Sequence, residues 1–158
     1  MCSFPTPRAD DNMGMPIPIL VKRLRNDLSG AADLGIDVPD IPDSIDLPFA
    51  IDITLHDTEA FSAPETPCPD QRFTIFIGED YPYERPKVRW NTEIFHPNIM
   101  PHSEGGSVCV AELDHWTFDS NLKEFIETLI DLVDHPNPFN PLANPTCAAA
   151  AEWFLDRV

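Results

Sequence analysis

One cysteine of this chain is well placed for nucleophilic chemistry. Cys109 lies between two valines just after a glycine-containing loop, and the tripeptide His96-Pro97-Asn98 stands a short way upstream. A thiolate attacks acyl carbon, and a neighbouring loop can leave an opening for a macromolecular substrate. A side-chain amide such as that of Asn98 can donate an N–H to a developing oxyanion. The pattern therefore favours acyl transfer at Cys109, with Asn98 and His96 as candidate site residues.

Simpler interpretations exist for the same residues. A lone cysteine between valines is often a small buried apolar residue, and an asparagine in a loop often forms a turn. A cysteine hydrolase would need a histidine base and an orienting acid or amide, but the spacing of His96, His102 and His115 resembles no such triad. A zinc site of His102, Cys109 and His115 would lack a convincing fourth ligand.

Composition narrows the class of partner. The chain has 158 residues, 42% of them hydrophobic, with 10 Lys+Arg against 27 Asp+Glu and a net charge of −17. This length suits one domain with its own core. Nucleic-acid binding and attraction to anionic lipid both rely on a basic surface, so we expect neither nucleic acid nor membrane as a partner.

The cysteines and the N-terminus indicate the compartment. No Cys-x-x-Cys pair occurs among Cys2, Cys68, Cys109 and Cys147, so a zinc or redox motif is not expected. No apolar run is long enough for a secretion signal or a membrane span. We expect reduced thiols, a cytoplasmic or nuclear localisation, and no cofactor or bound metal.

Hydrophobic periodicity predicts an N-terminal helix and a sheet. Residues 1–16 are expected to form a flexible arm, and residues 17–158 the core domain. Apolar residues three and four apart predict a helix from Ile17 that Gly30 ends. Alternation near residues 51–55, 73–77 and 87–90 predicts three strands in an antiparallel meander, with residues 56–71 as a connection.

Two further helices are expected after the cysteine. The clearest helical period runs from Leu122 to Val133, with Asp119 or Ser120 as its cap and Pro136 at its end. A last helix begins at Asn144-Pro145. Helices set apart from an antiparallel sheet make an α+β fold.

Three motifs around Cys109 carry a family resemblance. They are Tyr81-Pro82 with Pro86-Lys87-Val88, His96-Pro97-Asn98-Ile99, and Pro136-Asn137-Pro138 with Pro141-Leu142. Their order resembles that of ubiquitin-conjugating enzymes over roughly residues 17–155. The resemblance implies that family's α+β fold, with an N-terminal helix, an antiparallel meander, an active-site loop and C-terminal helices.

The same resemblance implies roles for the site residues. Cys109 would accept ubiquitin or a ubiquitin-like modifier from an activating enzyme as a thioester and pass it to a substrate lysine. Asn98 would stabilise the oxyanion, and His96 would hold the loop. Asn140 stands where many members carry an acid beside the incoming lysine, so we expect slow discharge to free lysine unless a ligase assists.

Binding surfaces follow in the same way. Lys22, Arg23 and Arg25 match the basic first helix that contacts the activating enzyme, although a solvated helix face has the same pattern. Tyr83 and Phe118 correspond to the two loops that ligases grip, where an exposed aromatic would be an anchor and a packed one would be core.

The chain also departs from the family pattern. The stretch from Asn98 to Cys109 is longer than usual, and the extra residues, within 100–106, could tilt the Asn98 amide away from the thioester. Residues 48–57 resemble the neddylation-type branch, whose N-terminal extension docks on its activating enzyme; Phe4, Met13 and Met15 could serve so. A non-catalytic variant that binds ubiquitin or a ligase is the alternative.

Overall fold

The computed structural model of the chain describes residues 15–109 and 113–157. Most of the predicted arm, including Phe4 and Met13, therefore lies outside the described residues. The first described helix is α2 (Ile17–Ala31), whose buried side chains lie three and four residues apart as predicted: Leu20, Val21, Leu24, Leu28 and Ala31.

This helix ends one residue beyond its predicted end at Gly30, and a turn of 3-10 helix follows it. Gly30 stays helical because the chain continues through buried Ala31 into the 3-10 helix η1 (Ala32–Leu34). Gly35 ends η1 with a φ of 73°, a left-handed conformation that glycine adopts without strain.

The three-stranded antiparallel meander is confirmed. Its strands lie in the order β1 (Phe49–Leu55), β4 (Gln71–Ile77) and β5 (Lys87–Trp90). Ile51 lies opposite Ile75, and Phe73 lies opposite Trp90, so one face of the sheet is apolar. Trp90 and Phe73 stack with ring centroids 4.9 Å apart.

The expected plain connection at residues 56–71 is wrong in one respect. It contains a small hairpin of β2 (Phe61–Ala63) and β3 (Thr66–Pro67). Its edge packs on the C-terminal helix, where the rings of Phe61 and Trp153 meet edge to face at 5.2 Å. Strands this short, with a proline in one, carry no alternation that a sequence can show.

Two helices follow the site. The start of α4 (Leu122–Asp134) is capped by Asn121, whose side chain accepts the Glu124 N–H at 3.0 Å, so neither Asp119 nor Ser120 is the cap. The predicted start of α5 (Pro145–Leu155) is confirmed, since Asn144 accepts the Cys147 N–H at 3.0 Å.

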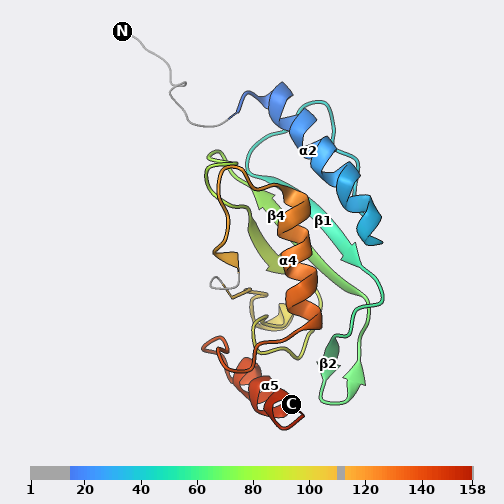
Figure 1. Cartoon of the computed structure of the whole chain (residues 1–158), viewed down its shortest axis with the longest axis vertical. Helices are drawn as coiled ribbons and strands as arrows, with labels where there is room; N and C mark the ends of the chain where they lie inside the picture. Colours follow the sequence, from blue (N-terminus) through green and yellow to red (C-terminus); the bar gives the residue numbers. More distant parts are fainter. Residues whose placement is uncertain (1–14, 110–112, 158) are drawn as a thin grey trace.

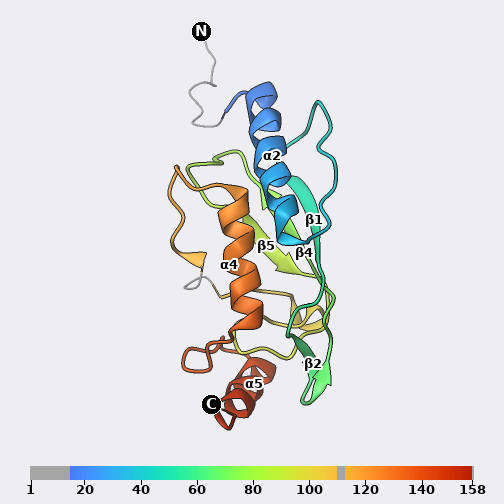
Figure 2. The same ribbon diagram turned by 45° about the vertical axis from the view of Figure 1, so that its right-hand side comes forward.

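The helices take different places around the sheet. Figure 1 shows α4 across one face of the sheet with α2 alongside, and Figure 2 shows α5 at the opposite end of the molecule from α2. Apolar side chains of α2, α4 and the sheet form one core. The molecule thus has the expected α+β fold. Within the described ranges, no helix has the length and apolar character needed to cross a membrane.

Candidate active site

The backbone pairs Cys109 directly with Asn98. The Cys109 N–H donates to the Asn98 carbonyl at 2.9 Å, and the Met100 N–H donates to the Ser107 carbonyl at 2.8 Å. Between them Ile99 and Val108 form an antiparallel bridge. The long stretch before Cys109 therefore closes as a hairpin, and its extra residues extend outward without separating the cysteine from the asparagine.

The loop of this hairpin is firmly held by the sheet. It contains the 3-10 helix η2 (His102–Glu104). Glu93 accepts both the hydroxyl and the backbone N–H of Ser103, each at 2.7 Å, and these bonds lower the pKa of the Glu93 carboxyl. Gly106 has a φ of 67°, and a Cβ there would lie 2.3 Å from the Trp90 carbonyl oxygen, so the close approach requires glycine.

A second carboxylate ties the loop to α5. Glu104 accepts the side-chain N–H of Asn144 at 3.0 Å and the hydroxyl of Thr146 at 2.9 Å. Both partners lie at the N-terminal end of α5. The loop therefore links the end of the sheet to the start of α5, and we call this link the strut.

His96 is part of the architecture of the site. Its side chain is 1% exposed, its Nδ1 accepts the Asn98 N–H at 3.0 Å, and its Nε2 lies 2.7 Å from the Leu132 carbonyl. Since Nδ1 is an acceptor, the proton must be on Nε2, which donates to Leu132. Burial lowers the pKa of His96 to about 4. A neutral ring with both nitrogens engaged is not available as a general base.

Asn98 holds the proline-rich turn that follows α4. Its Nδ2 donates to the carbonyls of Asn137 and Asn140, both at 3.1 Å, and its Oδ1 accepts the Asn137 N–H at 2.8 Å. Reversing the amide would set Oδ1 against two carbonyl oxygens, so this orientation is the only one that satisfies all three bonds. Both N–H groups are in use, and donation to an oxyanion would require exchange of one of them.

The turn that Asn98 grips exposes two neighbouring side chains. Asn140 is exposed, while its carbonyl is bonded to Asn98. Phe139 is 77% exposed, although its backbone N–H donates to the Asn137 side chain at 3.1 Å. None of the motifs around Cys109 points to Phe139 as a site residue. A phenylalanine among prolines that exclude helix and central strand was the available signal.

Comparison with known proteins agrees with this geometry. The family model for ubiquitin-conjugating enzymes matches residues 60–153, which include the Cys109 hairpin, His96, Asn98 and the proline-rich turn. The chain belongs to the ubiquitin-conjugating enzyme family.

Two related sequences are similar to part of this chain. "Ubiquitin-conjugating enzyme E2 N" of Drosophila melanogaster is 38% identical over 46% of this chain and 47% of the relative. The Macaca fascicularis protein of the same name is 34% identical over 52% of this chain and 51% of its own length. The chain thus matches about half the length of these curated relatives.

Solved structures match over more of the chain. S. cerevisiae Ubc12 is 27% identical with a TM-score of 0.68, covering 93% of this chain and 76% of that one. A Toxoplasma gondii ubiquitin-conjugating enzyme domain, 22% identical with a TM-score of 0.61 over 85% of this chain and 86% of that one, shows the same fold.

The three described cysteines of this family member differ in setting. Cys109 is 7% exposed and Cys68 is half-buried. Cys147 is fully buried, its thiol lies 3.6 Å from the Ile99 carbonyl, and burial, together with the charges of Glu104 and Cys109, raises its pKa to about 11. Cys147 therefore stays a neutral thiol and does not compete as a nucleophile. Cys2 lies outside the described residues.

The basic residues of α2 are less free than the sequence indicates. Arg23 donates to the Ser120 carbonyl at 2.7 Å, beside Asp27, which accepts the Leu122 N–H at 3.2 Å. These contacts tie α2 to the start of α4, and burial raises the pKa of Asp27.

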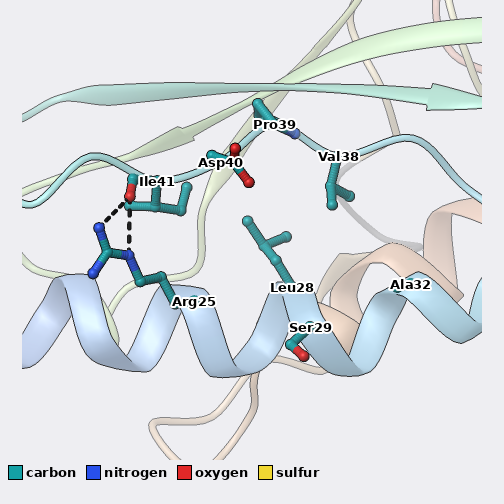
Figure 3. A pocket seen from close by; sticks show the side chains of 8 residues that line it. All are labelled: Arg25, Leu28, Ser29, Ala32, Val38, Pro39, Asp40 and Ile41. Carbon is teal, nitrogen blue, oxygen red and sulfur yellow. Dashed lines mark hydrogen bonds between the residues drawn. The ribbon is translucent and has the colours of Figure 1, made fainter.

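Arg25 is also engaged. It donates to the Ile41 carbonyl at 2.9 Å and pairs with Asp43 at 2.8 Å. Figure 3 shows Arg25 reaching from α2 to Ile41, with Leu28 pointing from α2 toward the facing segment. These residues line a groove of about 440 Å³. Lys22, the third predicted contact for an activating enzyme, is exposed on α2.

The two predicted ligase loops meet in space. Tyr83 is 56% exposed, Phe118 is 59% exposed, and their rings stack with centroids 6.1 Å apart. Behind them the Trp116 indole N–H donates to the Pro82 carbonyl at 2.7 Å and fixes the loops together. The two aromatic residues therefore form one exposed apolar surface.

The alternative of a metal centre has no support in the part of the chain that the structure describes. No group of three or more His, Cys, Asp or Glu side chains there is arranged to hold a metal ion. His102 instead lies with its Nδ1 3.2 Å from the Trp90 carbonyl.

Proposed function

We propose that this chain is a conjugating transferase that carries ubiquitin or a ubiquitin-like protein on Cys109 and delivers it to a substrate lysine. The observation that carries the proposal is the pairing of Cys109 with Asn98, whose side chain in turn holds the turn at residues 137–140. A cysteine, a buried scaffold and an exposed turn thereby meet at one place. Family membership supports the same reaction class.

The proposed reaction has two acyl transfers. In the first, the Cys109 thiolate attacks the carbonyl carbon of the modifier's thioester on the activating enzyme, whose cysteine leaves as a thiolate. In the second, the amine of a substrate lysine attacks the new thioester on Cys109. The C–S bond breaks, Cys109 leaves as a thiolate, the amine loses a proton, and an amide bond remains.

Asn98 and His96 support these steps chiefly by position. His96 fixes the backbone of Asn98, and Asn98 fixes both the Cys109 backbone and the turn that presents Asn140. Stabilisation of the oxyanion by Asn98 remains a proposal, since one of its N–H groups would first have to leave a carbonyl.

With Asn140 in place of an acid, this chain is expected to activate the incoming lysine only weakly. Its amide can accept a hydrogen bond from the incoming amine but takes up no proton. We expect Asn140→Asp to accelerate discharge of the thioester to free lysine at neutral pH, because a carboxylate would orient and help deprotonate the amine. Unchanged discharge by this variant in a single-turnover gel assay would contradict the assignment.

The proposed partners occupy different surfaces. Lys22 would face the activating enzyme, while Arg23 and Arg25 mainly shape the helix that presents it. The stacked pair of Tyr83 and Phe118 would anchor a ligase, since exposed aromatic side chains on fixed loops are frequent hot spots. We place this pathway in the cytoplasm or nucleus.

We infer a neddylation-type modifier. The lead-in and first strand at residues 48–57 support this choice, as does the likeness to S. cerevisiae Ubc12. The two relatives named E2 N favour ubiquitin instead.

A non-catalytic binding variant is the second candidate. It is favoured by the burial of Cys109, which is only 7% exposed, and by the full engagement of the Asn98 amide. Such a protein would bind a modifier or a ligase without forming a thioester.

A charging experiment separates these candidates. The protein is mixed with ATP and either the ubiquitin or the neddylation activating system, and is run on a non-reducing gel beside Cys109→Ser. A reductant-sensitive adduct with the neddylation modifier alone is expected. An adduct with ubiquitin alone would overturn the choice of modifier, and no adduct with either from folded protein would support the binding variant.

A further inference from the structure

Phe139 has an unusual setting beside the candidate active site. It is 77% exposed, against 59% for Phe118 and 56% for Tyr83, the two aromatic residues of the predicted ligase surface. It follows Pro138 and precedes Asn140, in a turn that neither α4 nor α5 includes. A large apolar ring is thus kept in water within the segment that Asn98 holds.

Hydrogen bonds and prolines hold the backbone of this turn in one conformation. The Phe139 N–H donates to the Asn137 side chain, and the carbonyls on either side of Phe139, those of Asn137 and Asn140, are both bonded to the buried Asn98. Farther along, the Leu142 N–H donates to the Pro97 carbonyl at 2.9 Å. Prolines 136, 138 and 141 remove further backbone freedom. The backbone that carries the exposed ring is therefore fixed before binding, which lowers the ordering entropy that binding costs.

The same hydrogen bonds connect the backbone of this turn, through Asn98, to the backbone of Cys109. Asn98 is bonded to the Cys109 N–H through its carbonyl and to the Asn140 carbonyl through its side chain. Phe139 is the neighbour of Asn140, the residue proposed to meet the incoming lysine. A segment that presents its lysine amine to Cys109 beside Asn140 is therefore expected to pass near Phe139.

We propose that Phe139 is a specificity-determining residue that selects acceptor segments carrying an apolar side chain beside the reacting lysine. The inference rests on the proposed function, since it concerns the acceptor of that reaction. The net charge of −17 is compatible with a segment that carries the positive lysine, and the ring supplies the apolar contact that charge alone does not.

The test uses two peptides that each contain one lysine and differ only in its neighbour, leucine in one and serine in the other. Thioester-loaded full-length protein is mixed with each peptide in a single turnover. The unmodified protein is expected to prefer the leucine peptide by on the order of fivefold, the effect of one apolar hot-spot contact. Phe139→Ala is expected to lose that preference, and Phe139→Tyr to retain it.

A second measurement detects peptide binding in the absence of the transfer reaction. Uncharged, isotope-labelled protein is titrated with both peptides, and backbone amide shifts are followed by NMR. Shifts around residues 137–142 that are larger for the leucine peptide, and absent in Phe139→Ala, support the proposal even if no thioester forms. In that case only the proposed transferase function fails.

A control variant and three possible results decide whether the ring selects the peptide. Leu155→Ala removes another exposed apolar side chain, 40% exposed on α5, and is expected to leave the peptide preference intact. Equal use of the two peptides by the unmodified protein, or an equal loss with both peptides in Phe139→Ala, would contradict selection by the ring. Shifts confined to Tyr83 and Phe118 would assign apolar recognition to the predicted ligase surface instead.

Discussion

Two sets of side chains, an inner part of buried polar residues beside Cys109 and an outer part of aromatic residues on exposed loops, are used in opposite ways. On the inner part, the polar residues His96 and Asn98 are 1% and 0% exposed and bond to backbone groups. On the outer part, the aromatic residues Tyr83, Phe118 and Phe139 are more than half exposed. The usual order of polar outside and apolar inside is reversed at this site. Buried polar groups that are fully paired fix one backbone arrangement, whereas exposed rings on fixed loops are ready for contact.

The largest effect is expected from removing the inner scaffold. Asn98→Ala removes three part-buried hydrogen bonds, to the Asn137 N–H and to the carbonyls of Asn137 and Asn140. We expect a loss of about 3 kcal/mol in the free energy of unfolding, because three hydrogen bonds are lost and each contributes about 1 kcal/mol. Urea denaturation measures this, with Asn26→Ala on the exposed side of α2 as the control. A loss no greater than in the control would refute the scaffold role.

A smaller loss of stability is expected when the pH is lowered, because His96 is buried in its neutral form. The pKa of the folded ring is about 4, while an unfolded histidine titrates near 6.5. Between these values the unfolded state binds more protons, so stability falls as the pH drops through this window. The loss from this residue is about 2 kcal/mol at pH 5 relative to pH 7.5.

Denaturation of His96→Gln isolates this contribution from that of the many carboxylates. The variant is expected to show a flatter pH dependence of unfolding than the unmodified protein, because glutamine does not titrate. Asn26→Ala, which changes an exposed side chain that does not titrate, serves as the control and is expected to keep the original slope. Identical slopes for His96→Gln and the unmodified protein would mean that the buried ring carries no such penalty.

The strut between the hairpin loop and α5 is expected to have a moderate effect. Glu104→Ala removes the bonds to Asn144 and Thr146, and we expect Tm to fall by about 3 °C. Glu127→Ala, an exposed carboxylate on α4, is the matched control in calorimetry. An unchanged Tm in Glu104→Ala would show that the long loop is held by Glu93 and Gly106 alone.

The outer aromatic surface is expected to matter least for stability and most for partners. Tyr83→Ala and Phe118→Ala should each change the free energy of unfolding by only about 0.5 kcal/mol, since their rings are already in water. Discharge stimulated by a cognate ligase should fall about tenfold or more, as for a binding hot spot. Strong destabilisation together with intact ligase stimulation would reverse the comparison between the two parts.

The sequence predicted the elements of the fold better than the contacts of the site residues. The α+β layout, the three-stranded meander and the Asn144 cap were correctly expected from periodicity and local chemistry. The roles of Asn98 and Arg23 depend on partners 39 to 42 and 97 residues away, and no local pattern shows such contacts.

Other differences have local physical reasons. The cap of α4 is Asn121 because the Ser120 hydroxyl already accepts the Thr117 N–H at 3.0 Å. The extra residues before Cys109 close a hairpin pinned by Glu93 and Glu104, so the backbone of Asn98 stays paired with that of Cys109, and these bonds join segments distant in the sequence. Burial, which the motifs do not report, separates the scaffold residues from the exposed rings.

The most direct measurement is the intact mass of the protein after incubation with ATP, the activating enzyme and the modifier, followed by proteolytic mapping of the adduct. The account predicts a gain of one modifier, reversed by a thiol reductant, with the adduct on Cys109 and with Cys147 unmodified. An adduct on Cys68, the more exposed thiol, or no adduct on folded protein would contradict it.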